Sequence, residues 1–132
     1  LRQDPRVILL ERCNIRHLPR QAIPEPVDLA VIDVSFISLR LVLPAVVPFL
    51  RPGGRIIALI KPQFEVGKGL VGKGGVVRDP ALQRHAVSLV QVEATKLGLV
   101  PRGIIPAPIR GPKGNQEYLL DLQVPAADAC SP

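Results

Sequence analysis

Two unbroken apolar runs, each ending in a charged residue, constrain the fold of this chain most. The first run covers residues 29–32 and ends at Asp33, and the second covers residues 56–60 and ends at Lys61. Apolar runs of strand length with a helical stretch between them are typical of parallel strands that are covered on both faces. In open α/β sheets the ligand site lies beyond the carboxyl ends of such strands. The pattern predicts a site that contains Asp33 and Lys61; the alternative is that both are ordinary strand-end residues, paired with each other or with solvent.

The rest of the chain continues this alternation of strands and helices. The pattern predicts strands near residues 6–11, 28–33 and 56–61, and helices over residues 38–50 and 80–97. Because strands and helices alternate, we expect a single α/β domain built on a parallel sheet.

Capping residues mark the ends of the two predicted helices. Ser35 or Ser38 can cap the first helix, and Asp79 followed by a proline is a strong start for the second. Gly98 can end the second helix because glycine tolerates the left-handed conformation. A turn is expected at residues 51–54, where a proline precedes two glycines.

The C-terminal part of the chain predicts an antiparallel hairpin. Residues 99–109 and 117–124 are two extended runs, and the short connection at residues 110–115 allows them to pair at the edge of the sheet. The small and polar tail over residues 125–132 is expected to be flexible.

Charge and composition favour an anionic partner. The formal net charge is +6 and the sequence pI is about 10.0, which favours RNA or DNA ahead of a membrane surface. The apolar stretches are too short and too interrupted for a transmembrane span. Cys13 and Cys130 are too few for a disulfide framework or a zinc site, so a reducing compartment is expected. The chain contains no methionine, and we interpret it as a piece of a longer protein.

A glycine-rich segment imitates two phosphate-binding motifs. Residues 67–72 satisfy the pattern GxGxxG, and residues 67–73 satisfy the first seven positions of a Walker A loop. Both motifs need a helix that opens directly behind the glycines, and a Walker A loop needs Ser or Thr where Gly74 stands. We reject both interpretations in favour of a basic, mobile loop.

Four linked motifs resemble a known family. In chain order they are Asp33–Leu39 (DVSFISL), Ile60–Glu65 (IKPQFE), Lys73–Asp79 (KGGVVRD) and Gly111–Glu117 (GPKGNQE). Together they resemble the TlyA or hemolysin A-like family, whose methyltransferase domain is of the FtsJ (RrmJ) type. Residues 4–7 and 11–16 extend the resemblance, which runs from residue 1 to about residue 124.

The resemblance implies an S-adenosylmethionine-dependent enzyme that methylates the 2′-oxygen of ribose in ribosomal RNA. It implies a Rossmann-like methyltransferase fold truncated at its N-terminus, with residues 1–124 as the C-terminal portion of the domain. The implied protein is cytoplasmic, binds ribosomal RNA or a ribosomal subunit, and uses no metal and no membrane. An N-terminal RNA-binding domain, a glycine-rich cofactor loop and one catalytic lysine are expected upstream. The piece itself is therefore expected to be inactive and to bind the cofactor weakly.

The resemblance also implies the catalytic residues. FtsJ-type enzymes use a Lys-Asp-Lys-Glu tetrad, of which this sequence carries Asp33, Lys61 and Glu117 by motif. A ribose hydroxyl is a poor nucleophile until its proton is removed, and a lysine serves as the base when burial or a neighbouring cation lowers its pKa. We expect Lys61 to act on the hydroxyl and the two acids to orient it.

Further residues are predicted to bind the cofactor and the RNA. The cofactor residues are expected to be Asn14, Ile15, Asp33, Val34 and Phe36, although Asn14 also suits a plain turn and Phe36 also suits the core. The residues that meet phosphates are expected to be Arg16, Lys68, Lys73, Arg78 and Arg110, although basic loop residues are more often simply solvated.

Two other functions remain open from the sequence. One is a non-catalytic RNA-binding remnant with the same fold. The other is a cytolysin, which requires an amphipathic or membrane-spanning segment that we do not find in the sequence.

Overall fold

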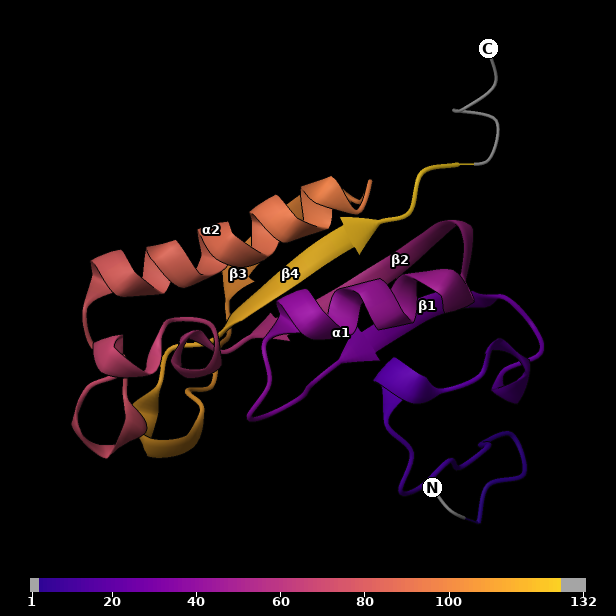
Figure 1. Ribbon diagram of the computed structural model, residues 1–132, viewed down its shortest axis with the longest axis horizontal. Helices are drawn as coiled ribbons and strands as arrows, with labels where there is room; N and C mark the ends of the chain where they lie inside the picture. The colour runs from indigo at the N-terminus through magenta and orange to yellow at the C-terminus, as the bar shows by residue number, and fades with distance from the viewer. Residues whose placement is uncertain (1–2, 127–132) are drawn as a thin grey trace.

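A four-stranded mixed sheet forms the centre of the molecule (Figure 1), and the computed structural model describes residues 3–126. The sheet has the order β1-β2-β4-β3, with β1 at Val27–Ile32, β2 at Leu50–Ile60, β4 at Tyr118–Gln123 and β3 at Val100–Pro106. Strand β1 pairs in parallel with β2, whereas β4 runs antiparallel to both β2 and β3. The predicted strands at 28–33 and 56–61 and the predicted terminal hairpin are confirmed.

Both predicted helices are present and pack over the same face of the sheet (Figure 1). Helix α1 covers Leu39–Val46 and continues as a 3-10 turn over Val47–Phe49, with Pro44 inside it. Of the two predicted caps for α1, the structure uses Ser38, whose side chain accepts a hydrogen bond from the backbone N–H of Arg40.

The second helix, α2, covers Pro80–Lys96. Asp79 caps α2 as predicted, by accepting a hydrogen bond from the backbone N–H of Ala81. Gly98 ends the helix with a φ of 82°, the left-handed conformation that glycine adopts without strain.

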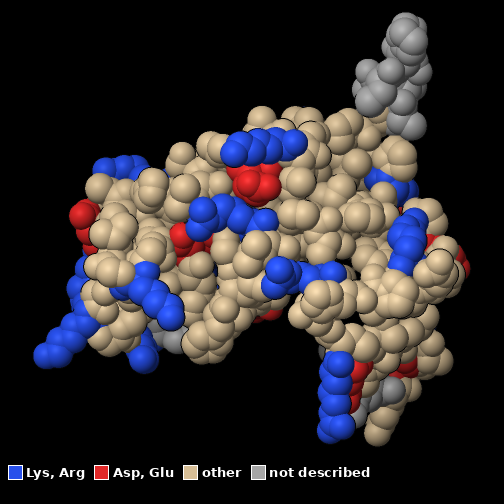
Figure 2. Space-filling view, in the orientation of Figure 1, with Lys and Arg blue, Asp and Glu red and all other residues tan. Residues whose placement is uncertain are grey.

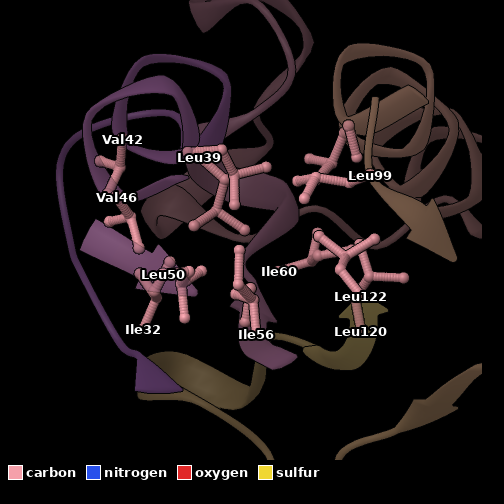
Figure 3. Close-up of a cluster of buried hydrophobic side chains, with 14 residues drawn as sticks. Ile32, Leu39, Val42, Val46, Leu50, Ile56, Ile60, Leu99, Leu120 and Leu122 are labelled. Carbon is pink, nitrogen blue, oxygen red and sulfur yellow. The ribbon is translucent and has the colours of Figure 1, made fainter. Parts of the chain in front are cut away.

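The hydrophobic core lies between the two helices and the sheet (Figure 3). Alternate residues of β2 point into it, and Ile56, Ala58 and Ile60 are all fully buried. Leu39 and Leu43 of α1 and Leu120 of β4 complete the centre of this core. The opposite face of β1 carries Leu29 and Val31 exposed. The two helices therefore cover the face of the sheet that carries Ile56, Ala58 and Ile60.

Two sequence predictions are wrong. Residues 6–11 form no strand, and Val7, Ile8, Leu9 and Leu10 are exposed, because the segment runs through the N-terminal loops away from the sheet, with no described strand beside it (Figure 1). Residues 51–54 belong to β2 instead of a separate turn. They form a bulge, since β1 advances from Val27 to Leu29 while its partner advances from Leu50 to Arg55.

Candidate active site

An ion pair joins the ends of the two parallel strands β1 and β2. Lys61 Nζ lies 2.7 Å from Asp33 Oδ1 and donates a hydrogen bond to Ser35 Oγ at 3.0 Å. The Lys61 side chain is 10% exposed and the Asp33 side chain is 66% exposed, so the lysine is largely buried whereas the acid is open to solvent. The structure thus brings Asp33 and Lys61 together, as the two polar strand ends predicted.

Glu117 reaches the same edge of the sheet from the antiparallel strand. It precedes Tyr118, which pairs with Ile60, the residue before Lys61. Glu117 is 5% exposed and accepts a hydrogen bond of 3.4 Å from Gln63 Nε2. Gln63 Oε1 is buried and has no hydrogen-bond partner among the described residues.

A large open cavity of about 950 Å³ lies against this edge. Lys61 and Gln63 form part of its wall, and its other polar lining includes Arg16, Lys68 and Lys113 and no acidic residue. Phe36 lies in the same cavity, is 89% exposed and has a φ of 63°, which is uncommon for a bulky residue. Its ring lies 4.9 Å from that of Phe64, centroid to centroid. The cavity therefore combines positive charge with an exposed aromatic surface.

A second, smaller cavity of about 340 Å³ lies beside Asp33. Ile15, Asp33 and Val34 line it together with apolar residues of β1 and α1. Asn14, also predicted for the cofactor, is exposed and uses its side chain to accept a hydrogen bond from the N–H of Arg16 at 3.0 Å. Asp33 thus lines the apolar cavity while its ion-pair partner Lys61 lines the basic one.

The predicted phosphate-binding residues fall on loops near the carboxyl ends of β1 and β2. Figure 2 shows Lys and Arg side chains that project from the end of the molecule where residues 61–79 and 107–117 lie in Figure 1. Arg16 and Lys68 line the basic cavity. Arg78 donates to Lys73 O at 3.1 Å and Arg110 donates to Gly114 O at 3.2 Å, so these two arginines also brace their own loops.

Sequence reasoning missed several residues that organise these loops. Ser35 contacts Lys61, and Gln63 connects the lysine segment with Glu117. Asn115 is 2% exposed and ties two loops together, because its side chain accepts from Val77 N at 2.9 Å and donates to Gly75 O at 3.0 Å. All three residues lie within the four sequence motifs, and this membership was the only signal that could have identified them.

Some classes of site are absent from the described part of the chain. Residues 3–126 contain no group of three or more His, Cys, Asp or Glu side chains that is placed to hold a metal ion. Among the same residues, no helix is both long enough and apolar enough to cross a membrane. Cys13 is exposed and not in a disulfide, and Cys130 and most of the tail at 125–132 lie outside the described residues.

The parallel pair of β1 and β2, with helices over one face and polar residues at the carboxyl ends, is a Rossmann-like α/β arrangement. A solved N-methyltransferase, NodS from Bradyrhizobium japonicum in complex with S-adenosyl-L-homocysteine, has a TM-score of 0.50 at 14% identity over 86% of this chain and 52% of its own, a likeness of fold alone. The chain belongs to the FtsJ-like methyltransferase family, whose family model matches residues 1–124.

Two closer relatives cover nearly the whole chain. The 16S/23S rRNA (cytidine-2′-O)-methyltransferase TlyA of Mycobacterium tuberculosis is 50% identical over 131 residues, which are 99% of this chain and 49% of the relative. A solved Streptococcus thermophilus protein that carries the name "putative hemolysin" has a TM-score of 0.90 at 38% identity, over 99% of this chain and 49% of its own. The chain therefore spans about half the length of these relatives.

Proposed function

We propose that the protein carrying this chain transfers a methyl group from S-adenosylmethionine to a ribose 2′-oxygen of ribosomal RNA. The observation that carries the proposal is the ion pair between Asp33 and Lys61, because its two members line different cavities. One cavity is apolar and one is basic and aromatic, as a methyl donor and an RNA strand respectively require. The family membership and the activity for which the Mycobacterium tuberculosis relative is named support the same chemistry.

The smaller cavity fits the adenosyl end of the cofactor. Its apolar lining by Ile15 and Val34 suits a purine ring, and the Asp33 carboxylate is an acceptor for ribose hydroxyls. When bound, S-adenosylmethionine supplies an electrophilic methyl group. Asn14 and Phe36 were also predicted to bind the cofactor, but neither lines the smaller cavity, and Phe36 lines the larger one.

The larger cavity fits a single-stranded segment of RNA. Arg16, Lys68 and Lys113 offer positive charge to the phosphates, and Phe36 offers a face on which a base can stack. Lys73, Arg78 and Arg110 extend this charge along the neighbouring loops. The cytoplasm, where ribosomal RNA is made and modified in bacteria, is the proposed location, and an N-terminal RNA-binding domain is the proposed upstream partner.

The proposed role of Lys61 is to act on the attacking hydroxyl. In the structure its amine forms an ion pair with Asp33 and donates a hydrogen bond to Ser35, and a base requires the unprotonated amine. Glu117, held through Gln63, is proposed to orient the amine or the hydroxyl. Methyl transfer is an in-line displacement, so the alignment of hydroxyl and methyl group accounts for much of the acceleration.

The test is single-turnover methylation of ribosomal RNA by the full-length protein, with the modified nucleotide identified by mass spectrometry. Lys61→Ala should abolish methylation and leave cofactor binding nearly unchanged, because Lys61 lies outside the apolar cavity. Lys61→Arg should also fail if Lys61 is a base, since a guanidinium stays protonated. A near wild-type rate for Lys61→Arg would leave only an electrostatic role for the residue. RNA binding by the wild type without any methylation would instead favour a non-catalytic RNA-binding protein.

A further inference from the structure

Glu65 is a buried acid to which neither the motifs nor the proposed reaction gives a role. It follows the 3-10 turn at Pro62–Phe64, four residues after Lys61, and lies under the start of α1. Its side chain is only 1% exposed. A carboxylate this buried requires partners, because burial without them is costly.

The Glu65 carboxylate is bound by the first residues of α1. Oε1 accepts a hydrogen bond from Ser38 Oγ at 2.5 Å, and Oε2 accepts one from the backbone N–H of Leu39 at 2.8 Å. Arg40 lies 3.4 Å from Oε1 through Nε, and its Nη2 donates to the backbone carbonyl of Glu65 at 2.7 Å. The first turn of α1 has no acidic residue of its own, so Glu65 supplies the negative charge that a helix N-terminus favours.

These contacts connect two segments that both carry site residues. Residues 33–38 include Asp33, and residues 61–65 include Lys61. At one end the segments are joined by the Lys61 contacts to Asp33 and Ser35, and at the other end by the Glu65 contacts to α1. Phe36, between the two joints, has a φ of 63°, and such a conformation persists only where the surroundings fix it.

We propose that Glu65 is a positioning residue for methyl transfer: its carboxylate fixes the start of α1 and thereby holds the turn at residues 33–38 against Lys61. Glu65 touches neither of the reacting groups, and its effect passes through Asp33 and Ser35. The proposal rests on the proposed function, since it assigns a role within that reaction.

Stability alone does not account for an acid at this position. Burial raises the pKa of Glu65 above its usual range, against the smaller opposing effects of the Ser38 and Leu39 hydrogen bonds and of Arg40. Ionisation of this carboxyl therefore costs free energy in the folded protein. A buried polar group that is costly and fully bonded is better explained by the geometry that it enforces.

The test compares Glu65→Gln with wild type in the full-length protein. Glutamine keeps the shape but loses one acceptor, so the turn at residues 33–38 loosens. We expect the single-turnover rate to fall about 10- to 100-fold, as for a misplacement of roughly 1 Å. The dissociation constants for RNA and cofactor should change less than the rate, because the proposed sites of both ligands also include residues outside this turn, such as Ile15, Arg16 and Lys68. A rate within about two-fold of wild type would overturn the proposal.

Two further variants keep the test decisive if Glu65→Gln folds poorly. Ser38→Ala removes the hydrogen bond to Oε1 together with the α1 cap on the Arg40 N–H, and should lower the rate less than Glu65→Gln; Ser38→Thr, which keeps the hydroxyl for both contacts, should preserve it. Asp121→Asn is the matched control, because it breaks the ion pair with Arg55 between β2 and β4 and leaves residues 33–38 untouched. An equal rate loss in Asp121→Asn and Ser38→Ala would show a general structural effect and overturn the positioning role.

Hydrogen exchange separates this proposal from the proposed function. In Glu65→Gln the amides of residues 33–40 should exchange faster than in wild type, whereas those of α2 should not change. If wild-type protein methylates no RNA, the proposed function fails and the exchange comparison alone decides whether Glu65 holds the turn. Unchanged exchange at residues 33–40 would overturn the proposal.

Discussion

Gly111 offers the sharpest way to move Glu117 without removing it. A Cβ built on Gly111 would lie under 3.0 Å from Cδ and Oε2 of Glu117 and 3.1 Å from its Cγ. Carbon atoms pack best at about 3.5–4.0 Å, so in Gly111→Ala the buried carboxylate must shift by roughly 1 Å. A misplacement of this size costs about 10²-fold in rate, which corresponds to about 2.7 kcal/mol of transition-state stabilisation.

The assay is single-turnover methylation with enzyme in excess, well below the unfolding temperature. Unfolding must be measured beside it, because an overpacked site also loses about 1–3 kcal/mol of stability. Gly69→Ala is the matched control: no atom lies within 4 Å of a Cβ built there, and its rate should equal that of wild type.

The double variant Gly111→Ala/Glu117→Ala tests whether the rate loss in Gly111→Ala arises from displacement of Glu117. Glu117→Ala alone should slow the reaction less than Lys61→Ala, because an orienting group is involved only indirectly. Gly111→Ala should add little to Glu117→Ala, since its clash partner is gone. A wild-type rate in Gly111→Ala, or losses that simply add in the double variant, would refute the placement of Glu117 in the site.

Three further predictions concern RNA binding by Phe36, the pH dependence of stability at Glu65, and the affinity of the chain for the cofactor. Phe36→Ala should leave the unfolding temperature unchanged because the ring is 89% exposed, yet weaken RNA binding by about 1–3 kcal/mol in a titration with single-stranded RNA, as for other base-stacking residues. The raised pKa of Glu65 means that the folded state binds its proton more tightly than the unfolded state, so stability from this group falls as pH rises from 4.5 towards the folded pKa. In urea unfolding, Glu65→Gln should therefore lose less stability relative to wild type at pH 7 than at pH 4, and a pH-independent difference would contradict this. The 132-residue chain alone should bind S-adenosylmethionine weakly, and low-micromolar affinity by calorimetry would show that the cofactor site is misplaced.

The sequence predicted the parts of the fold that depend on local signals. Asp79 with the following proline and Gly98 set the ends of α2, because caps act on the nearest turn of backbone. The approach of Asp33 to Lys61 followed from the rule that parallel strands end at one edge, and the ion pair of 2.7 Å confirms it. The helix ends needed only local signals, and the approach of Asp33 to Lys61 needed only the rule for parallel strands.

The errors concern features that depend on partners elsewhere. The apolar residues 7–10 match a strand pattern, but a strand also requires a neighbour to pair with, which the pattern cannot show. The bulge at 51–54 depends on the register between β1 and β2, so a glycine pair there looked like a turn. Glu65 and Asn115 were missed as organising residues because their partners lie 26 and 38 residues away in the chain.

The insertion of β4 between β2 and β3 also bears on when the site can form. Glu117 reaches the carboxyl edge only because the last strand enters an interior position of the sheet and runs against its neighbours. Its pairing with β2 spans a long stretch of chain, and such non-local pairings are slow because the loop must close before the contacts form. The acid should therefore join Asp33 and Lys61 late in folding, after β1, α1 and β2 have assembled. A newly made chain would hold its lysine and aspartate in place before it acquired the third member of the set.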